Sequence, residues 1–176
     1  MNGKDEVRKK LKAARARFAG EDRVLADKAV YENFINNYLG CESFFVFSSF
    51  GSEADTKKII SRLIGADKRV YLPRVEGDTM LAVPYGEMQR GAFGIYEPCG
   101  QPYSGKIDVA AIPLLAVNGR GYRLGYGKGF YDKFLRGRPE ILKVGLGYSF
   151  QLSEFNEDGW DIPLDAFVSD TGVIKF

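Results

Sequence analysis

Histidine is absent from the 176 residues, and cysteine is scarce. Without an imidazole, the chain has no Ser–His or Cys–His nucleophile pair, no histidine-ligated zinc and no histidine general base. Its two cysteines, Cys41 and Cys99, stand far apart with no partner at metal-ligand spacing, which favours two reduced thiols. Any chemistry must therefore use carboxylates, Lys, Arg, Tyr, backbone amides or a hard metal ion.

Long apolar runs and a strong excess of one charge are also missing. No stretch approaches the roughly 18 consecutive apolar residues of a membrane span, and the start, "MNGKDEVRKKLK", is charged where a signal peptide is apolar. Lys and Arg number 25 and Asp and Glu 23, so the net charge of +2 does not by itself indicate nucleic-acid binding. We therefore expect a cytoplasmic protein that binds no membrane and no nucleic acid.

The composition that remains is typical of a folded, soluble protein. Hydrophobic residues make up 45%, aromatic residues 14% and charged residues 27%. The length suffices for one domain with a real core and is short for two. We expect a single domain over residues 1–176.

Two amphipathic helices are predicted at the start of the chain. Apolar residues recur at helical spacing from Val7 to Phe18, and this helix should end near Gly20. A second helix should begin at Asp22, which can cap it, and stop around Gly40.

The next segments predict a parallel sheet. The apolar run Ser43–Phe50 is typical of a buried strand, Ala54–Leu63 of a helix and Arg69–Leu72 of a second strand. A strand–helix–strand unit of this length makes a parallel crossover. Residues 73–105 predict one strand at "TMLAVPY" and an irregular surface loop after it.

The most apolar strand, Ile107–Val117, should lie at the centre of the sheet. A further strand is predicted at "ILKVGLGYSF", and short extended pieces at the end of the chain. These patterns predict an α/β fold: a single three-layer domain with a central, mostly parallel sheet flanked by helices.

A glycine-rich segment, "RLGYGKGFYDKFL", runs from Arg123 to Leu135 after the central strand and into a helix. Glycines at 125, 127 and 129 free the backbone to turn its amides toward one point, and Lys128 and Arg123 place cations at the rim. Together they indicate a phosphate site, although a flexible connection is the alternative. The spacing matches neither a Walker A loop nor a Rossmann fingerprint.

This segment resembles the glycine-rich segment of the 5-formyltetrahydrofolate cyclo-ligase family, whose pattern is close to R-L-G-x-G-x-G-x-Y-D. The resemblance covers nearly the whole chain. Lys4 and Arg8 match the K-x-x-x-R of the family's first helix, and "SFGSEADT" matches its S-x-x-x-E-x-x-T loop. "YLPRV", "DVAAIPLLAVN" and "WDIPLD" match in the same order.

The resemblance implies a ligase of one-carbon metabolism. Members use ATP and Mg²⁺ to convert 5-formyltetrahydrofolate to 5,10-methenyltetrahydrofolate, ADP and phosphate: ATP phosphorylates the formyl oxygen, N10 attacks the activated carbon, and phosphate leaves. Positioning and charge neutralisation matter more in such a reaction than a titrating histidine does. We expect a monomer that accepts the folate with or without a polyglutamate tail.

The resemblance also implies which residues bind ATP. Lys128 and Arg123 would be the catalytic cations, with Lys128 facing the transferred phosphoryl group. The implied ATP contacts are Lys4, Arg8, Arg123, Leu124, Gly125, Tyr126, Gly127, Lys128, Gly129, Phe130 and Tyr131. For Lys4 and Arg8, four residues apart on one helix face, the alternative is an ordinary solvated basic surface.

The folate would be bound by a different loop together with the glycine segment. Glu53 would accept hydrogen bonds from the pterin, and its alternative is a cap of the following helix. Phe93 would border the folate, unless it is a buried core residue. The full set implied by the resemblance is Ser48, Glu53, Phe93, Tyr126, Gly127, Lys128, Gly129 and Phe130.

Two aspartates would hold Mg²⁺, which prefers one or two carboxylates plus phosphate oxygens. Asp132 follows the phosphate loop directly, and Asp161 in "WDIPLD" matches the family's second carboxylate, with Asp165 the weaker candidate. Helix capping is the alternative for Asp132, and a charged surface turn is the alternative for either.

Two departures from the family's pattern stand out. Phe130 replaces a tyrosine of many members, and Trp160 stands where many bacterial members have histidine. Two other functions are kept open: an anion-binding module that grips single-stranded nucleic acid through basic and aromatic residues, and a different ATP-dependent ligase or kinase on the same scaffold.

Overall fold

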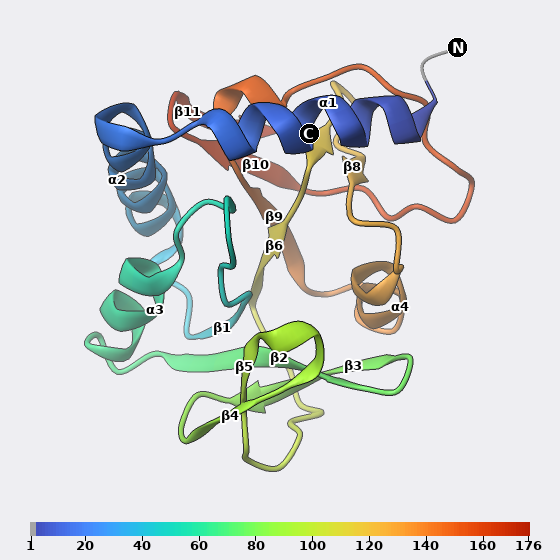
Figure 1. The fold of residues 1–176 in the computed structure, drawn as a ribbon. Helices are drawn as coiled ribbons and strands as arrows, with labels where there is room; N and C mark the ends of the chain where they lie inside the picture. Colours follow the sequence, from blue (N-terminus) through green and yellow to red (C-terminus); the bar gives the residue numbers. More distant parts are fainter. Residues whose placement is uncertain (1–2) are drawn as a thin grey trace.

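A seven-stranded sheet is the centre of the computed structural model, which describes residues 3–176 (Figure 1). Its strand order is β11-β10-β9-β6-β1-β2-β3. The strands are β1 (Ser43–Val46), β2 (Arg69–Glu76), β3 (Thr79–Pro84), β6 (Val109–Pro113), β9 (Leu142–Leu146), β10 (Ala166–Ser169) and β11 (Gly172–Lys175). The middle five are parallel and the two edge strands antiparallel. The predicted α/β class is confirmed.

Helices cover both faces of this sheet. The helices in residues 3–176 are α1 (Lys4–Arg17), α2 (Gly20–Tyr38), α3 (Lys57–Ile64) and α4 (Phe130–Arg136), of which α2 and α3 pack on one face and α4 on the other. Because strand side chains alternate, Phe44 of β1 packs with α2 and α3, whereas Phe45 stacks on Phe134 of α4, with 4.5 Å between ring centres. The expected three layers are therefore present. No helix in residues 3–176 has the length and apolar character to span a membrane.

Helix α1 belongs to neither layer and crosses one end of the sheet (Figure 1). Val7 and Leu11 pack there on a small hairpin formed by β7 (Ala116–Val117) and β8 (Arg123–Leu124). The predicted single strand Ile107–Val117 is therefore wrong in its extent. It breaks after β6, where the chain leaves the sheet, and Leu115 bonds to the backbone of the hairpin instead.

Several predicted boundaries also shift. Helix α2 begins at Gly20, without a side-chain cap, and not at Asp22. The first strand ends at Val46, and α3 begins at Lys57 because residues 47–56 form a loop of their own, held by Thr56. The predicted irregular loop contains a short hairpin, β4 (Met88–Arg90) and β5 (Tyr96–Pro98), whose three-residue strands are too short to show periodicity.

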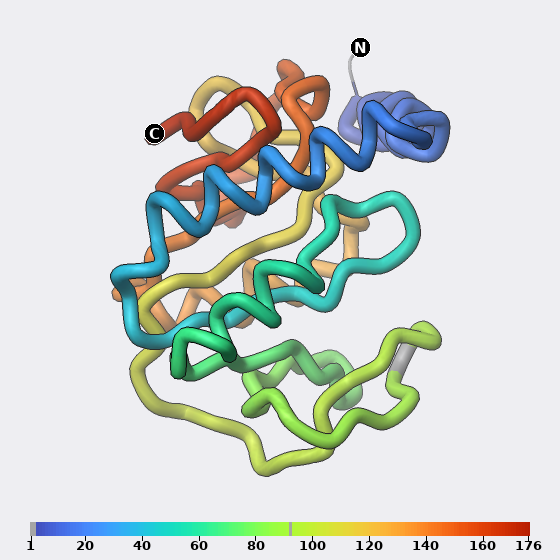
Figure 2. The backbone as a smooth tube through the Cα atoms, turned by 90° about the vertical axis from the view of Figure 1, so that its left-hand side faces the viewer, coloured from blue at the N-terminus to red at the C-terminus, as the bar shows by residue number. Residues whose placement is uncertain are grey.

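The segments that matter for function gather along one side of the molecule. Figure 2 shows the 47–56 loop between α1 above it and the yellow-green segment of residues 85–100 below. The parallel strands β1 and β6 direct their carboxyl ends toward this region, which is where α/β sheets place their ligands.

Candidate active site

The glycine loop, residues 125–129, links the small hairpin to α4. Its turns require glycine at two positions, because φ is +92° at Gly127 and +70° at Gly129. Tyr126, Gly127 and Lys128 are exposed. The loop thus presents backbone to solvent at the end of the sheet, as a phosphate site requires.

An aromatic pair lies beside the predicted catalytic lysine. The Nζ of Lys128 lies 6.0 Å from the centre of the Phe93 ring, and Phe93 lies 6.3 Å from the ring of Phe130. Phe93 is 64% exposed, so its alternative as a buried core residue is wrong. The structure therefore brings together three of the predicted ligand-binding residues from two distant parts of the chain.

Arg123 is not at the rim of the loop, as the sequence suggested, but buried. Its two terminal nitrogens donate to the two carboxylate oxygens of Asp132 at 3.0 and 3.2 Å. Asp132 thus forms a bidentate ion pair and does not cap α4. The buried Arg123 fixes the position of this carboxylate. The buried Nε of Arg123 has no hydrogen-bond partner in residues 3–176.

The first helix contributes two cations to the same region. Lys4 donates to Asp158 and Asp161, each at 2.7 Å, and Arg8 donates through Nε to the carbonyl of Gly125 at 3.0 Å. Burial alone would lower the pKa of Lys4, but the two carboxylates outweigh it and leave that pKa raised. These half-buried residues are not an ordinary solvated face.

The two predicted metal ligands lie on neighbouring segments. The backbone N–H of Ile162, next to Asp161, donates to Asp132 at 3.3 Å. Asp165 instead bonds to Lys143, where β9 and β10 begin, at the opposite end of the sheet. No group of three or more metal-binding side chains occurs in the described part of the chain. Two carboxylates fit Mg²⁺ that arrives with phosphate oxygens, which complete its coordination.

Glu53 meets the glycine loop directly. Its Oε1 accepts from the Tyr126 hydroxyl at 3.1 Å, and its Oε2 accepts from the backbone N–H of Phe50 at 2.9 Å. Burial raises the pKa of Glu53, against the hydrogen bond from Phe50 and the charge of Arg15. Glu53 precedes α3 by four residues and does not cap it. Ser48 lies in the same loop and is half-buried.

Comparisons with known proteins agree with this geometry. The model of the 5-formyltetrahydrofolate cyclo-ligase family matches residues 1–170. The 5-formyltetrahydrofolate cyclo-ligase of Escherichia coli K12 is 37% identical over 142 residues, which cover 73% of this chain and 78% of the relative. The chain belongs to the 5-formyltetrahydrofolate cyclo-ligase family.

Further relatives support the same conclusion. The cyclo-ligase of Haemophilus influenzae is 28% identical over 92% of this chain and 94% of its own. The solution structure of Aquifex aeolicus 5,10-methenyltetrahydrofolate synthetase matches with a TM-score of 0.88 and 32% identity, over 98% of this chain and 92% of that one. The predicted enzyme class, a ligase of folate one-carbon metabolism, is confirmed.

Two residues that the family pattern places along ATP are turned inward in this cyclo-ligase family member. Leu124 packs with Val7 and Leu11 of α1, and Tyr131 lies between Arg123 and Phe45. Burial raises the pKa of Tyr131, so its hydroxyl stays protonated. These two side chains therefore support the loop from within the fold, and the loop exposes its backbone and Lys128 to solvent.

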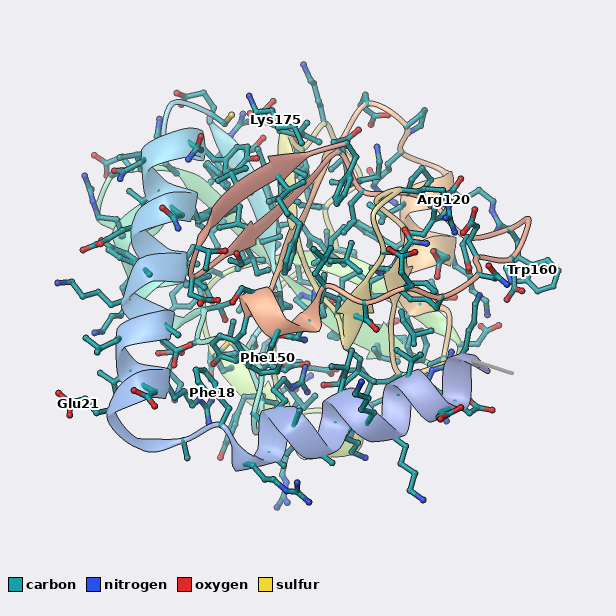
Figure 3. All side chains as sticks on the ribbon, turned by 90° about the horizontal axis from the view of Figure 1, so that it is seen from above. Phe18, Glu21, Arg120, Phe150, Trp160 and Lys175 are labelled. Carbon is teal, nitrogen blue, oxygen red and sulfur yellow. The ribbon has the colours of Figure 1, made fainter. Side chains whose placement is uncertain are left out.

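Trp160 replaces the histidine of many bacterial relatives, and it points away from the body of the protein (Figure 3). Its side chain is exposed, and its carbonyl accepts a hydrogen bond from Arg136 of α4 at 3.2 Å. The tryptophan ring therefore takes no part in holding Asp161, whose carboxylate is bonded by Lys4 and by the backbone N–H of Asp158.

Sequence reasoning missed Arg15, the buried arginine of α1. Arg15 bonds to the Tyr126 hydroxyl, to Ser52 and to the carbonyl of Leu114. A signal for it existed in the helical period. Positions 7, 11 and 15 lie on one face of the helix, so Arg15 continues the buried stripe of Val7 and Leu11 although its neighbours are basic and exposed.

Proposed function

We propose that the protein catalyses the ATP- and Mg²⁺-dependent cyclisation of 5-formyltetrahydrofolate to 5,10-methenyltetrahydrofolate, with release of ADP and phosphate. The observation that carries this proposal is the hydrogen bond between Tyr126 and Glu53. It joins the loop proposed to bind ATP to the carboxylate proposed to bind the folate. The γ-phosphate and the formyl oxygen would then meet beside that contact.

The two covalent steps need alignment more than they need acid–base chemistry. The formyl oxygen attacks the γ-phosphorus, and the bond from that phosphorus to ADP breaks. N10 then attacks the activated carbon and gives up its proton to the departing phosphate or to solvent, and the bond from that carbon to the phosphate oxygen breaks as the ring closes. In our proposal the exposed Lys128 neutralises charge on the transferred phosphoryl group.

The other cations have supporting roles. Arg8, fixed on the carbonyl of Gly125, and Lys4 would bind phosphate oxygens of ATP. Arg123, the second predicted catalytic cation, would hold Asp132 through its bidentate pair. Asp132 and Asp161 would hold Mg²⁺, whose chemistry is to neutralise the negative charge of the phosphates.

On the folate side, Glu53 would accept from the amino group and ring N–H of the pterin, because each oxygen of an ionised carboxylate can accept more than the single hydrogen bond it has here. Phe93 and Phe130 would border the folate with apolar surface, and this contact needs no hydroxyl at position 130. The single domain over residues 1–176, the monomeric state, the cytoplasmic location and the use of polyglutamylated folate stay predictions.

A cyclisation assay tests the proposal. The protein mixed with MgATP and 5-formyltetrahydrofolate should generate the ultraviolet absorbance of the methenyl product at mildly acid pH, and it should release ADP at the same rate. Absence of both signals would overturn the proposal. Salt-sensitive binding to oligonucleotides without ATP turnover would favour the anion-binding module instead.

A further inference from the structure

Arg15 joins three segments that are distant in sequence. Its Nε donates to Ser52 of the 47–56 loop at 3.0 Å, and one terminal nitrogen donates to the carbonyl of Leu114, after β6, at 3.0 Å. The other terminal nitrogen donates to the hydroxyl of Tyr126 in the glycine loop. Arg15 is 4% exposed, so these bonds are made out of water's reach.

The direction of these bonds determines where the tyrosine proton goes. A guanidinium can only donate, so the Tyr126 oxygen accepts from Arg15. A phenol has one O–H, and that hydrogen is then directed at Glu53, whose Oε1 lies 3.1 Å away. The second carboxylate oxygen is held by the backbone of the same loop. Arg15 therefore fixes the orientation of Glu53 through a single intermediate group.

We infer that Arg15 is a positioning residue for the cyclisation, which aligns Tyr126 and, through it, Glu53 for the folate. The inference rests on the proposed function. Arg15 itself would contact neither ATP nor the folate. Its effect is to hold the folate carboxylate and the glycine loop in one arrangement, because a group placed even slightly wrongly loses much of its contribution.

The charge of Arg15 gives this role a readout that simple packing lacks. Arg15 lowers the pKa of Glu53 against the raising effect of burial. Glu53 also faces the Tyr126 hydroxyl from the glycine loop, and Tyr131 of α4 interacts electrostatically with it. The remaining charged groups that line the adjoining polar cavity, of about 250 Å³, are Arg23, Asp27, Asp55 and Lys57. Loss of Arg15 should therefore raise the pKa of Glu53. The acid limb of the curve of folate binding against pH, where binding weakens as Glu53 is protonated, should then move to higher pH.

Two variants separate the geometry of Arg15 from its charge. In Arg15→Gln both are lost, and the KM for 5-formyltetrahydrofolate should rise about 10- to 100-fold, as for a lost charge-assisted hydrogen bond. The acid limb should move to higher pH. Arg15→Lys keeps the charge but not the planar fork, so its acid limb should stay near that of the wild type while its KM remains raised. The KM for ATP should change much less in both.

Arg17, exposed on the same helix, supplies the matched controls Arg17→Gln and Arg17→Lys. Both should leave KM and the acid limb unchanged, and thermal unfolding of every variant separates these effects from loss of folding. Arg15 variants that fold and behave like the Arg17 variants would overturn the inference.

Tyr126→Phe tests the same path while it keeps the guanidinium and its bonds to Ser52 and Leu114, and it tests the inference if the Arg15 variants do not fold. It should raise the folate KM and move the acid limb in the same direction, because the Tyr126 hydrogen bond also lowers the pKa of Glu53. The double variant Arg15→Lys/Tyr126→Phe should be no worse than the worse single variant. Additive effects, or a Tyr126→Phe enzyme with wild-type folate KM, would overturn the inference.

Calorimetric titration of each protein with 5-formyltetrahydrofolate alone keeps the two proposals distinguishable. A wild-type protein that binds the folate without forming product would contradict the proposed function, and the affinities of the variants would still test Arg15. A wild-type protein that neither binds nor converts the folate would overturn both.

Discussion

The two loops that meet at Glu53 and Tyr126 are built in opposite ways. The 47–56 loop is closed by its own side chains: Thr56 donates to the carbonyl of Phe47 at 2.7 Å and accepts from the backbone of Ser49 at 3.0 Å. Helix α2 holds the same loop from outside. Arg23 donates to two of its carbonyls, and Asp27 accepts from the backbone N–H of Asp55.

The glycine loop has little of this support. Four of its five residues, 126 to 129, are exposed, and its path depends on the backbone freedom of Gly127 and Gly129. Its described anchors come from α1, where Arg8 holds the carbonyl of Gly125 and Arg15 holds the hydroxyl of Tyr126. The comparison teaches that the loop proposed to bind the folate is organised in advance, whereas the loop proposed to bind the phosphates leaves its hydrogen-bond donors free for a ligand.

The largest effect should come from a substitution in the exposed glycine loop. Lys128→Ala removes the exposed cation proposed to face the transferred phosphoryl group, and kcat should fall on the order of 100-fold or more, as for loss of one preorganised donor. Thermal unfolding should be unchanged, because Lys128 is exposed. Lys133→Ala, an exposed lysine of α4, is the control that should keep full activity. An active Lys128→Ala enzyme would remove Lys128 from the mechanism.

In the 47–56 loop, Glu53→Gln should raise the KM for the folate about 10- to 100-fold and leave the KM for ATP nearly unchanged. Steady-state kinetics with each substrate varied in turn measures this split. Equal rises in the two KM values would contradict the proposal that the 47–56 loop binds the folate and the glycine loop binds the phosphates.

Glu53 should also leave a signature in stability against pH. Burial raises the folded-state pKa of Glu53 above its unfolded value, so the folded protein binds more protons between those two values. The contribution of Glu53 to the free energy of unfolding therefore falls as pH rises through that window. Urea unfolding at several pH values should show this slope in the wild type and a weaker one in Glu53→Gln.

Asp132→Asn should raise the Mg²⁺ concentration for half-maximal activity on the order of 10-fold, a magnitude typical of damage to a metal site. Asp165→Asn is a matched control, because Asp165 is paired with Lys143 at the other end of the sheet. A titration of activity with Mg²⁺ distinguishes them. An unchanged requirement in Asp132→Asn would reduce Asp132 to a partner of Arg123.

The smallest effect concerns the backbone. Gly129→Ala places a side chain at a φ of +70°, which costs about 1–2 kcal/mol. Its Tm should fall by a few degrees. Gly137→Ala tests the same substitution at the other end of α4, where φ is −84° and no atom crowds an added methyl group, and should cost no stability. Similar values for the two variants would show that the loop relaxes around residue 129.

Much of the fold follows from local pattern, because buried parallel strands are apolar runs separated by turn residues. The central place of Val109–Pro113 and the β1–α3–β2 crossover were predictable for that reason. The break after Pro113 was not, since Ala116 and Val117 are equally apolar and only pairing with Arg123 and Leu124 takes them out of the sheet.

The site was predictable in its residues but not in its pairings. The family pattern named Arg123 and Asp132 as separate contacts, and it gave no sign that they bind one another. Arg15 was hidden among basic neighbours, because an arginine on the apolar stripe of a helix reads as one more surface charge unless its helical phase is counted. The charged residues can be read from the sequence, but which of them form ion pairs and hydrogen bonds depends on the fold.

The bond from Lys4 to Asp161 joins positions 157 residues apart. During synthesis on the ribosome, the first turn of α1 emerges long before its acidic partner, so Lys4 cannot make this bond until residue 161 has left the exit tunnel. A chain that stalls before residue 158 would leave Lys4 without either of its carboxylate partners.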